Sequence, residues 1–280
     1  MGAINVKHTG AGADIALSSD GTSLLLDGTA IGGGGAALEL YAENPSSPTA
    51  PSATGTNAVA IGTGSVSSAS TSVAIGDRTE ATANQTVAIG SLNTRCSSIQ
   101  GVAIGAARAT GLLGSVAIGG YGSGYSVASN NYSIALGRSN SSGGASFAAA
   151  ITNNTSSYGA TGANSVAMGQ YSRATGGGGI SIGSAFARAD GSQSVAIGRN
   201  VHATDSNSMA LGNEAVSDVR GKLAYSGGKI SATGDSQYGL CVLRQQTTDA
   251  TASVMKTTAY NANPSADNQV ILPNNSAYAF

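Results

Sequence analysis

The sequence predicts an all-β solenoid built from coils of about 14 residues. A Ser-Val-Ala-Ile-Gly motif stands unaltered at 72–76, 115–119 and 194–198. Near copies end at Gly62, Gly90, Gly105, Gly137, Gly169, Gly183 and Gly212. Successive glycines follow at a nearly constant spacing, apart from a longer step before Gly137 and a disturbed stretch after it. Such a short, fixed period is typical of a solenoid, in which each coil buries its apolar side only against its neighbours.

The motif alternates bulky and small residues, which is the period of a β-strand. We therefore expect Val and Ile on one side of the stacked coils, in two continuous rows, and Ser, Ala and Gly on the other. The bulky rows are predicted to form the core of the repeats, and the small side to lie against another chain. The predicted repeat core consists of Val73, Ile75, Val87, Ile89, Val102, Ile104, Val116, Ile118, Val166, Met168, Val195 and Ile197.

The second half of each coil reads as a polar residue, Ala and Thr, followed by a turn residue. Examples stand at 80–82, 173–176 and 202–205. Charged residues fall in this half, so we expect it to face water. Ser, Thr, Gly and Asn dominate and no apolar spacing of three or four recurs, which argues against a helix.

These repeats resemble the head repeats of trimeric autotransporter adhesins, the YadA-like head. The resemblance covers roughly Asn57 to Asp218, and 215–220 is similar to the exit from such a head into a neck. It implies a left-handed parallel β-roll in which three chains associate about a threefold axis. A single coil of this length buries too little apolar surface to be stable alone, so association is also expected on physical grounds.

Three regions are expected. Residues 1–54 form an N-terminal β region for attachment or capping, with strands at 14–18, 22–26 and 36–43 and a Pro-rich linker. Residues 55–219 form the roll, with inserted loops at 120–164. Residues 220–280 form a small antiparallel β module with strands near 240–243, 253–255 and 269–272. The sequences of residues 5–9, of residues 38–50 and of the section from Gly221 also resemble segments of tail-fibre-like proteins of marine phages.

Composition narrows the classes of function. The 280 residues include 41 Gly, three Phe and no Trp, and only 10% are charged, which suits thin stacked layers better than a thick enzyme core. A net charge of −1 offers no field for nucleic acid. Cys96 and Cys241 are read as free thiols. The beginning of the sequence has no secretory signal pattern, and no run is long enough for a membrane helix.

Insertions in a solenoid become loops that often lie on the binding face. The insertions carry tyrosines, whose rings can stack on sugars and whose hydroxyls can form hydrogen bonds. Trimer packing and simple filling of the loops are the alternatives. The candidate receptor contacts, expected to share one band, are Tyr121, Tyr125, Tyr132, Tyr158 and Tyr171.

We expect no catalytic residue, cofactor or metal. His202 occupies the position of Glu80 and Arg173 in other coils, which favours a solvated histidine over a metal ligand. The carboxylates of Asp190, Asp205, Glu214 and Asp218 fall at turn positions, which argues against a glycosidase pair. The Gly-rich segments at 10–12 and 120–124 are interpreted as turns. The threonines that recur in the second half-coil, Thr82, Thr110, Thr175 and Thr204, stand singly and are interrupted, so they would form a poor ice-binding surface.

The predicted function is that of a virion structural fibre, either a tail fibre or a spike. Such a fibre acts as a stiff trimeric spacer and adheres to the host surface. Its partners would be two further copies, other virion proteins through 1–54, and a host glycan or outer-membrane protein. A bacterial trimeric surface adhesin fragment and a non-adhesive decoration fibre are the alternatives. The end at Phe280 suggests a chain that was cut or processed.

Overall fold

The computed structural model describes residues 4–6, 15–19, 24–26, 29–31, 49–91, 94–121, 124–152, 157–246, 250, 252–258, 263–265 and 268–270, with the backbone alone for 4–31 and Tyr121. Within this part of the chain all regular structure is β, with no helix. The chain divides into two units, Met1–Ser46 and Ser47–Phe280.

The first unit is a four-stranded antiparallel meander of β1 (Ile4–Val6), β2 (Ile15–Ser19), β3 (Leu24–Leu26) and β4 (Thr29–Ile31). Strands β2 and β3 pair through Leu17 and Leu26, which agrees with the strands expected at 14–18 and 22–26. The strand expected at 36–43 lies outside the described residues.

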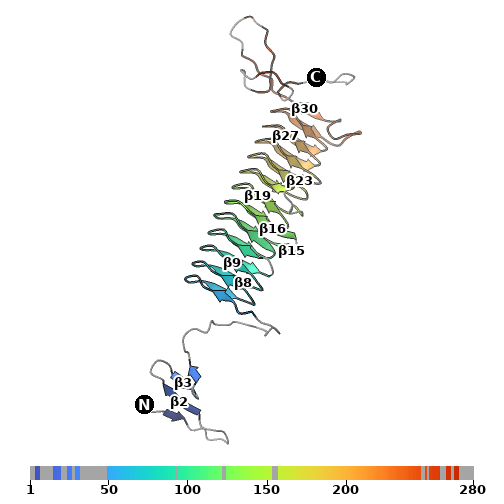
Figure 1. Ribbon diagram of the computed structural model, residues 1–280. Helices are drawn as coiled ribbons and strands as arrows, with labels where there is room; N and C mark the ends of the chain where they lie inside the picture. The colour runs from blue at the N-terminus through green and yellow to red at the C-terminus, as the bar shows by residue number, and fades with distance from the viewer. Residues whose placement is uncertain are drawn as a thin grey trace. The chain divides into compact units, whose positions relative to one another are not determined.

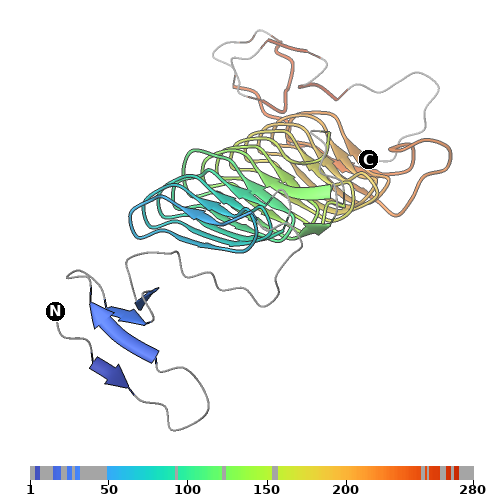
Figure 2. The same ribbon diagram turned by 60° about the horizontal axis from the view of Figure 1, so that its bottom comes forward.

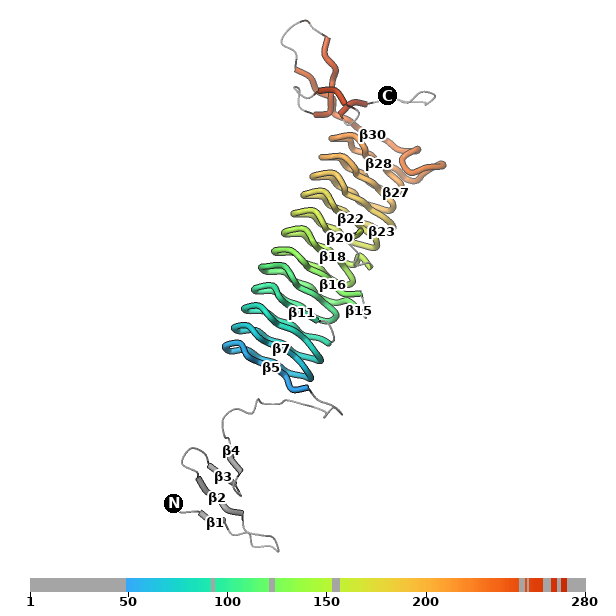
Figure 3. Tube along the Cα trace, in the orientation of Figure 1, coloured from blue at the N-terminus to red at the C-terminus, as the bar shows by residue number. Residues whose placement is uncertain are grey.

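The second unit is a parallel β-solenoid in which every coil contributes one strand to each of two sheets (Figures 1 and 3). We call the sheet that carries the Val-Ala-Ile strands the motif sheet. It consists of β6 (Val59–Ile61), β8 (Val73–Gly76), β10 (Val87–Gly90), β12 (Val102–Ile104), β14 (Val116–Ile118), β17 (Ile134–Leu136), β19 (Phe147–Ala149), β21 (Val166–Met168), β23 (Ile180–Ser184), β25 (Val195–Arg199), β27 (Met209–Asn213), β29 (Leu223–Ser226) and β30 (Tyr238–Leu240).

The second sheet of the solenoid, called here the opposite sheet, carries the polar half-coils. It consists of β5 (Ser52–Ala53), β7 (Val66–Ser67), β9 (Glu80–Ala81), β11 (Arg95–Cys96), β13 (Ala107–Ala109), β16 (Gly124–Ala128), β18 (Asn140–Ser141), β20 (Gly159–Ala160), β22 (Arg173–Ala174), β24 (Arg188–Ala189), β26 (His202–Ala203) and β28 (Val216–Ser217), with β15 (Gly120–Tyr121) antiparallel to β16.

The register confirms the predicted period, because equivalent motif positions pair directly. Val87 lies opposite Val73 in one neighbouring coil and Val102 in the other, and the Ala and Ile positions follow in step. Twelve strands of the motif sheet, β6 to β29, run parallel in this way. Figure 2 shows the coils closer to end-on. The solenoid begins at β5 and ends at β29, so it extends beyond the expected limits of 55 and 219 at both ends.

The side chains that fill the coils are the small ones, so the predicted repeat core is wrong for the single chain. The alanines of the motif, such as Ala103 and Ala196, are fully buried between the two sheets. The bulky residues point outward and are half-buried or exposed, for example Ile104 at 36% and Ile197 at 41%. The outward residues are Val73, Ile75, Val87, Ile89, Val102, Ile104, Val116, Ile118, Val166, Met168, Val195 and Ile197.

The physical reason is the narrow cross-section of a short coil. Two strands and two turns in so short a repeat bring the sheets so close that Ser67 in β7 and Ser72, just before β8, share a hydrogen bond of 2.6 Å. Only Ala, Ser, Thr, Cys and Gly fit at most interior positions, and among the described residues Ile151 and Val201 are the largest fully buried side chains. The small-residue side is therefore the interior of the coil and not a surface for another chain.

The serine that opens the motif also points inward, and in several coils its hydroxyl closes the preceding turn. The hydroxyl of Ser115 is an exception, because it is buried without a hydrogen-bond partner among the described residues. The Oγ of Ser72 donates to the carbonyl of Ala69 at 2.7 Å, and Ser194 donates to Gly191 at 2.7 Å. The hydroxyls of Ser72 and Ser194 thus each satisfy a carbonyl that the narrow interior shields from water.

The glycine that closes the motif is required by close stacking as well as by turn geometry. Gly198 has a φ of +138°, and a Cβ there would overlap the carbonyl oxygen of Gly212 in the next coil. The positive φ that the sequence predicts at this position is confirmed for Gly198 and Gly76.

The disturbed stretch at 120–164 does not interrupt the stacking. The hairpin of β15 and β16 is added to one coil and the sequence is longer before β20, while β17, β18 and β19 keep their register. The predicted degenerate coil at 146–150 is the regular strand β19, in which Phe147 takes the Val position.

Past the last coil the described residues form less regular structure. Strand β30 pairs antiparallel with β29, and a single antiparallel bridge joins Arg244 and Lys256. The remainder of the expected C-terminal β module is a prediction that these contacts do not test.

Candidate interaction surfaces

The outward side of the motif sheet, called here the motif face, is a continuous apolar surface. Its two columns hold the Val and Ile positions of every coil from β6 to β29, and none of these residues is charged. Strand β30 extends both columns, because Leu240 lies opposite Leu223 and Tyr238 opposite Tyr225. The exposed members are Val59, Ile89, Ile104, Ile118, Met168, Ile182, Ile197, Met209, Tyr225, Tyr238 and Leu240.

The outward side of the opposite sheet is polar, as the sequence predicts for the second half of each coil. One column carries Glu80, Arg95 and Arg108, and further along Arg173, Arg188 and His202. Arg95 and Glu80 form an ion pair at 2.6 Å. Water solvates such a column at little cost, so this side suits the exterior of an assembly.

The turns of the coils form two edges. We call the stack of turns before the motif the leading edge, and the stack after the motif glycine the trailing edge. Tyr132 lies on the leading edge, where its N–H donates to Leu113 and its side chain is 58% exposed. Tyr171 lies on the trailing edge, where its N–H donates to Ile151. The five predicted tyrosines are therefore divided between the two edges.

Three aromatic rings meet on the trailing edge. Tyr158 and Tyr171 have ring centroids 5.2 Å apart, and Tyr171 stacks on Phe186 with centroids 5.4 Å apart and planes inclined by 12°. Phe186 is 44% exposed, so the cluster presents ring surface to solvent. Phe186 was not predicted from the sequence; its position directly after a motif glycine turn, beside Arg188, was the available signal.

Tyr125 lies near the N-terminal end of β16, on the side of the trailing edge and apart from this aromatic cluster. The guanidinium of Arg108 stands 4.2 Å from the centre of its ring, which is a cation–π contact. Tyr121 belongs to β15 by its backbone, and its side chain lies outside the described residues.

The four carboxylates considered as a glycosidase pair each engage a cation. Asp205 lies 3.9 Å from Arg220, and Asp218 lies 3.0 Å from Lys222. Asp190 is held by Arg173 and accepts from Thr175 at 2.8 Å. Burial alone raises the pKa of Asp190, but the hydrogen bonds and charge of Arg173 outweigh it and hold the pKa below 3.8. Asp190 is therefore the ionised partner of Arg173 at neutral pH.

His202 stands in the column with Arg188. Burial and the neighbouring Arg188 charge lower its pKa, and its Nε2 has no hydrogen-bond partner among the described residues. No three His, Cys, Asp or Glu side chains in the described part of the chain are placed to share a metal ion. Nor does this part contain a helix long and apolar enough to cross a membrane.

Both cysteines are free thiols. Cys96 occupies an interior position that is Ala in the two neighbouring coils, and burial raises its pKa to about 11. Burial also raises the pKa of Cys241. A thiol in such a state is a poor nucleophile, so Cys96 serves packing.

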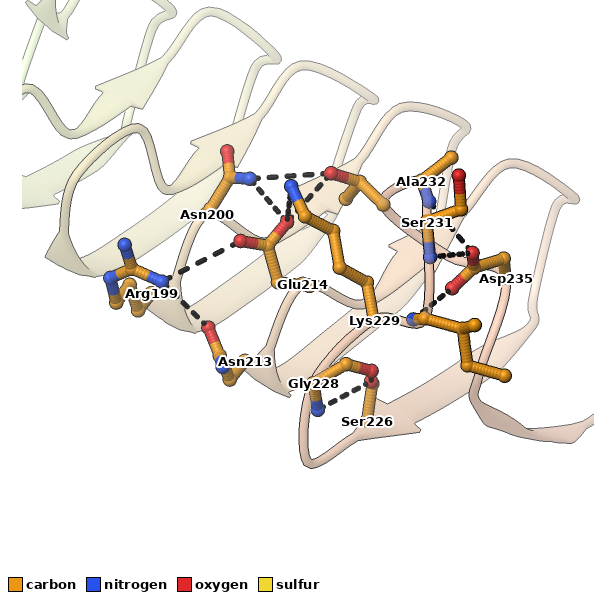
Figure 4. A network of polar contacts seen from close by, with 12 residues as sticks. Arg199, Asn200, Asn213, Glu214, Ser226, Gly228, Lys229, Ser231, Ala232 and Asp235 are labelled. Carbon is orange, nitrogen blue, oxygen red and sulfur yellow. Dashed lines mark hydrogen bonds and ion pairs between the residues drawn. The ribbon is translucent and has the colours of Figure 1, made fainter.

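The last coils carry a polar network centred on Glu214, whose side chain is 7% exposed (Figure 4). Its carboxylate accepts from Asn200 at 2.6 Å and Thr233 at 2.7 Å, and lies 3.5 Å from Arg199 and 3.4 Å from Lys229. Because Lys229 and Thr233 belong to the segment between β29 and β30, the network fastens this segment to the trailing edge.

The family model described as "YadA head domain repeat (2 copies)" matches the chain at residues 53–79, 67–93, 160–185 and 189–215. No curated protein matches the chain. All four segments lie in regular coils of the solenoid, and none falls within 94–159, the part of the chain that contains the hairpin of β15 and β16 and the insertion before β20. YadA head repeats are thus present, and they suggest a self-associating, surface-exposed protein of the adhesin type.

Proposed function

We propose that the protein is a homotrimeric fibre whose solenoid is a stiff spacer. The observation that carries this proposal is the motif face, which presents two uncharged columns over twelve coils. At about 4.8 Å per strand these columns run for roughly 50 Å. Soluble monomers rarely expose so large an apolar strip. Three copies about an axis cover all three motif faces and leave the polar opposite sheets in water.

A measurement of native mass tests the trimer. Light scattering of the full chain is expected to give three times the 27.1 kDa of one chain. The double variant Ile104→Lys/Ile118→Lys places two charges on the motif face and is expected to give folded monomers. The control Thr110→Lys/Ser129→Lys adds the same charges to exposed positions just past strands of the opposite sheet and is expected to stay trimeric. A well-folded wild-type monomer would contradict the proposal.

The finer proposal is a virion appendage, a tail fibre or spike, in which 1–54 attaches the fibre to the particle and other virion proteins. The resemblance of 5–9, 38–50 and the section from Gly221 to tail-fibre-like proteins supports this placement. The YadA head repeats favour a second candidate, a bacterial surface adhesin. An antibody against the solenoid separates the two, because it labels purified particles in the first case and intact bacterial cells in the second.

We further propose that the protein acts by binding a host surface and not by catalysis. The contact is assigned to the trailing edge with Tyr121, Tyr125, Tyr158 and Tyr171, while Tyr132 lies across the coil from them. A host glycan or an outer-membrane protein is the candidate partner. Removing the insertion at 152–158 is expected to abolish cell binding and to leave the trimer intact. Binding that survives would place the contact elsewhere.

A further inference from the structure

The charges of the solenoid are distributed unevenly along its axis. Between Glu80 and Asp190 the sequence contains no Asp or Glu, although the net charge of the whole chain is −1. The same stretch contains five arginines, Arg95, Arg108, Arg138, Arg173 and Arg188. The middle coils are therefore basic, and carboxylates stand only at the two limits of the stretch, at Glu80 and Asp190.

Two of these arginines are neutralised by the carboxylates at the limits of the stretch. Arg95 pairs with Glu80 at 2.6 Å, and the Arg173 guanidinium forms a bidentate ion pair with the Asp190 carboxylate. Arg188 lies in the strand next to Arg173, but its Nε is 4.0 Å from Asp190 and its side chain is 39% exposed. Because Asp190 is already occupied by Arg173 and Thr175, Arg188 keeps donors for a ligand.

The aromatic cluster lies directly beside these guanidinium groups. Tyr171 and Arg173 flank the buried Ser172, and Phe186 and Arg188 flank the buried Ala187, so each pair stands on the outward side of its coil. Phe186 has a φ of +74° and Tyr171 a φ of +54°. The same conformation recurs at turns of other coils on this edge, such as Arg78, Asn200 and Glu214, so it belongs to the coil and fixes where the two rings stand.

A similar arrangement recurs at β16. The Arg108 guanidinium covers one face of the Tyr125 ring at 4.2 Å, and Arg138 packs so closely on Gly124 that a Cβ there would overlap it. Among the described residues, no carboxylate pairs with Arg108 or Arg138. Strands β16 and β22 are three steps apart in the opposite sheet, which is about 14 Å.

We propose that the trailing edge binds an acidic polysaccharide that runs along the solenoid axis. A sugar ring lies against Tyr171 and Phe186 with its carboxylate or sulfate on Arg188, and a second acidic unit reaches Arg108 and Arg138. Aromatic faces take the apolar side of a pyranose ring, and guanidinium groups form strong, charge-assisted hydrogen bonds with oxyanions. This inference deepens the surface-binding role proposed above and rests on it.

The spacing of the charges favours a polysaccharide over a nucleic acid. Nucleic acid carries a charge every few ångströms of its axis and is bound by dense arrays of Lys and Arg. Here Arg108 and Arg138 have no carboxylate partner among the described residues, and Arg188 shares Asp190 with Arg173. These guanidinium groups are spread over several coils, which suits a polymer whose acid groups are widely spaced. The site also lies away from the motif face, so a trimer leaves it accessible.

The test uses the full chain on immobilised polymers. Polygalacturonate supplies carboxylates, dextran sulfate supplies sulfates, neutral dextran tests the ring alone, and single-stranded DNA tests a general polyanion. We expect binding to at least one acidic polysaccharide that strengthens with polymer length, with little binding to neutral dextran or DNA. Arg188→Gln and Phe186→Ala are each expected to weaken binding about tenfold. Arg78→Gln removes an exposed arginine outside the acid-free stretch and is expected to change nothing.

The outcomes separate this inference from the proposed function. A trimer that binds none of the four polymers, or binds them equally well with and without Arg188, overturns the polysaccharide site and leaves the fibre standing. DNA binding as tight as that of the acidic polysaccharides also overturns it. Polysaccharide binding by a monomer supports the site and contradicts the trimer. Light scattering of each variant keeps loss of folding apart from loss of binding.

Discussion

The side-chain amide of Gln237 forms two hydrogen bonds with the backbone of Val216. Its Oε1 accepts from the Val216 N–H at 2.8 Å, and its Nε2 donates to the Val216 carbonyl at 2.9 Å. Val216 belongs to β28, the last strand of the opposite sheet. One side chain thus takes the place of a further strand, while β30 closes the motif sheet. Open edges invite pairing with other chains, so both sheets are protected at this end.

Replacing Gln237 should loosen this end of the solenoid. Gln237→Ala leaves two backbone groups of Val216 without their partner, which costs about 1–3 kcal/mol for a shielded group. Gln237→Glu keeps the acceptor and loses the donor, so its effect should be intermediate. Hydrogen exchange of the Val216 amide is the measurement. Gln193→Ala, on the exposed leading edge, is the control, and equal exchange in both variants would contradict the capping role.

Enlarging an interior alanine should destabilise the coils strongly. Ala103 is fully buried between the sheets, and Ala103→Val adds two methyl groups where the sheets cannot separate. Overpacking of this kind costs about 1–3 kcal/mol. Thr110→Val places the same side chain at an exposed position just past the opposite sheet and should be nearly neutral. Denaturant unfolding of the two variants compares them, and similar midpoints would contradict a filled, narrow interior.

The network around Glu214 should make the last coils sensitive to acid. The Thr233 hydrogen bond, with help from Asn200 and Lys229, lowers the pKa of Glu214 below its ordinary 4.5. Because the folded pKa is the lower one, the stabilisation is complete above about pH 4.5 and is lost as the pH falls through the folded pKa. Protection of the segment 227–237 from hydrogen exchange, measured relative to the intrinsic exchange rate at each pH, should therefore fall in acid. Glu214→Gln should exchange faster at neutral pH and respond less to acid; an unchanged acid response would contradict the assignment.

The architecture could be predicted from the sequence because stacking forces identical residues into register. The spacing of the glycines alone gives the coil length, and Val87 does lie opposite Val73. The direction of the side chains could not be predicted in this way, because alternation says which residues share a side and not which side is inside. The size of the interior decides that, and a coil this short admits Ala103 but not Ile104.

The candidate site was predictable only in part. An insertion signals a loop, and Tyr158 was found for that reason, while Tyr171 comes from the regular coil that follows the insertion. Phe186 comes from a regular coil and joins them only through stacking across neighbouring coils. The role of Gln237 was invisible for a similar reason, since it lies far from Val216 along the chain and no motif marks the contact.

The leading edge should gain stability from glycine at selected turns. Thr71 is exposed and has a φ of +53°, which is strained for a β-branched residue, and Gly114 and Gly178 occupy the same column with φ values of +63° and +68°. Thr71→Gly should relieve about 1–3 kcal/mol of backbone strain. The greater conformational entropy of glycine in the unfolded chain costs about 0.5–1 kcal/mol, so the variant should be more stable than the wild type.

The reverse substitution, Gly178→Thr, should destabilise the protein, and Gly198→Ala should be worse because a Cβ there overlaps the carbonyl of Gly212. Denaturant midpoints of the three variants should therefore rank Thr71→Gly first, Gly178→Thr second and Gly198→Ala last. If Thr71→Gly lowers the midpoint instead, the hydrogen bond of 2.8 Å from its hydroxyl to the Ser70 carbonyl outweighs the backbone strain.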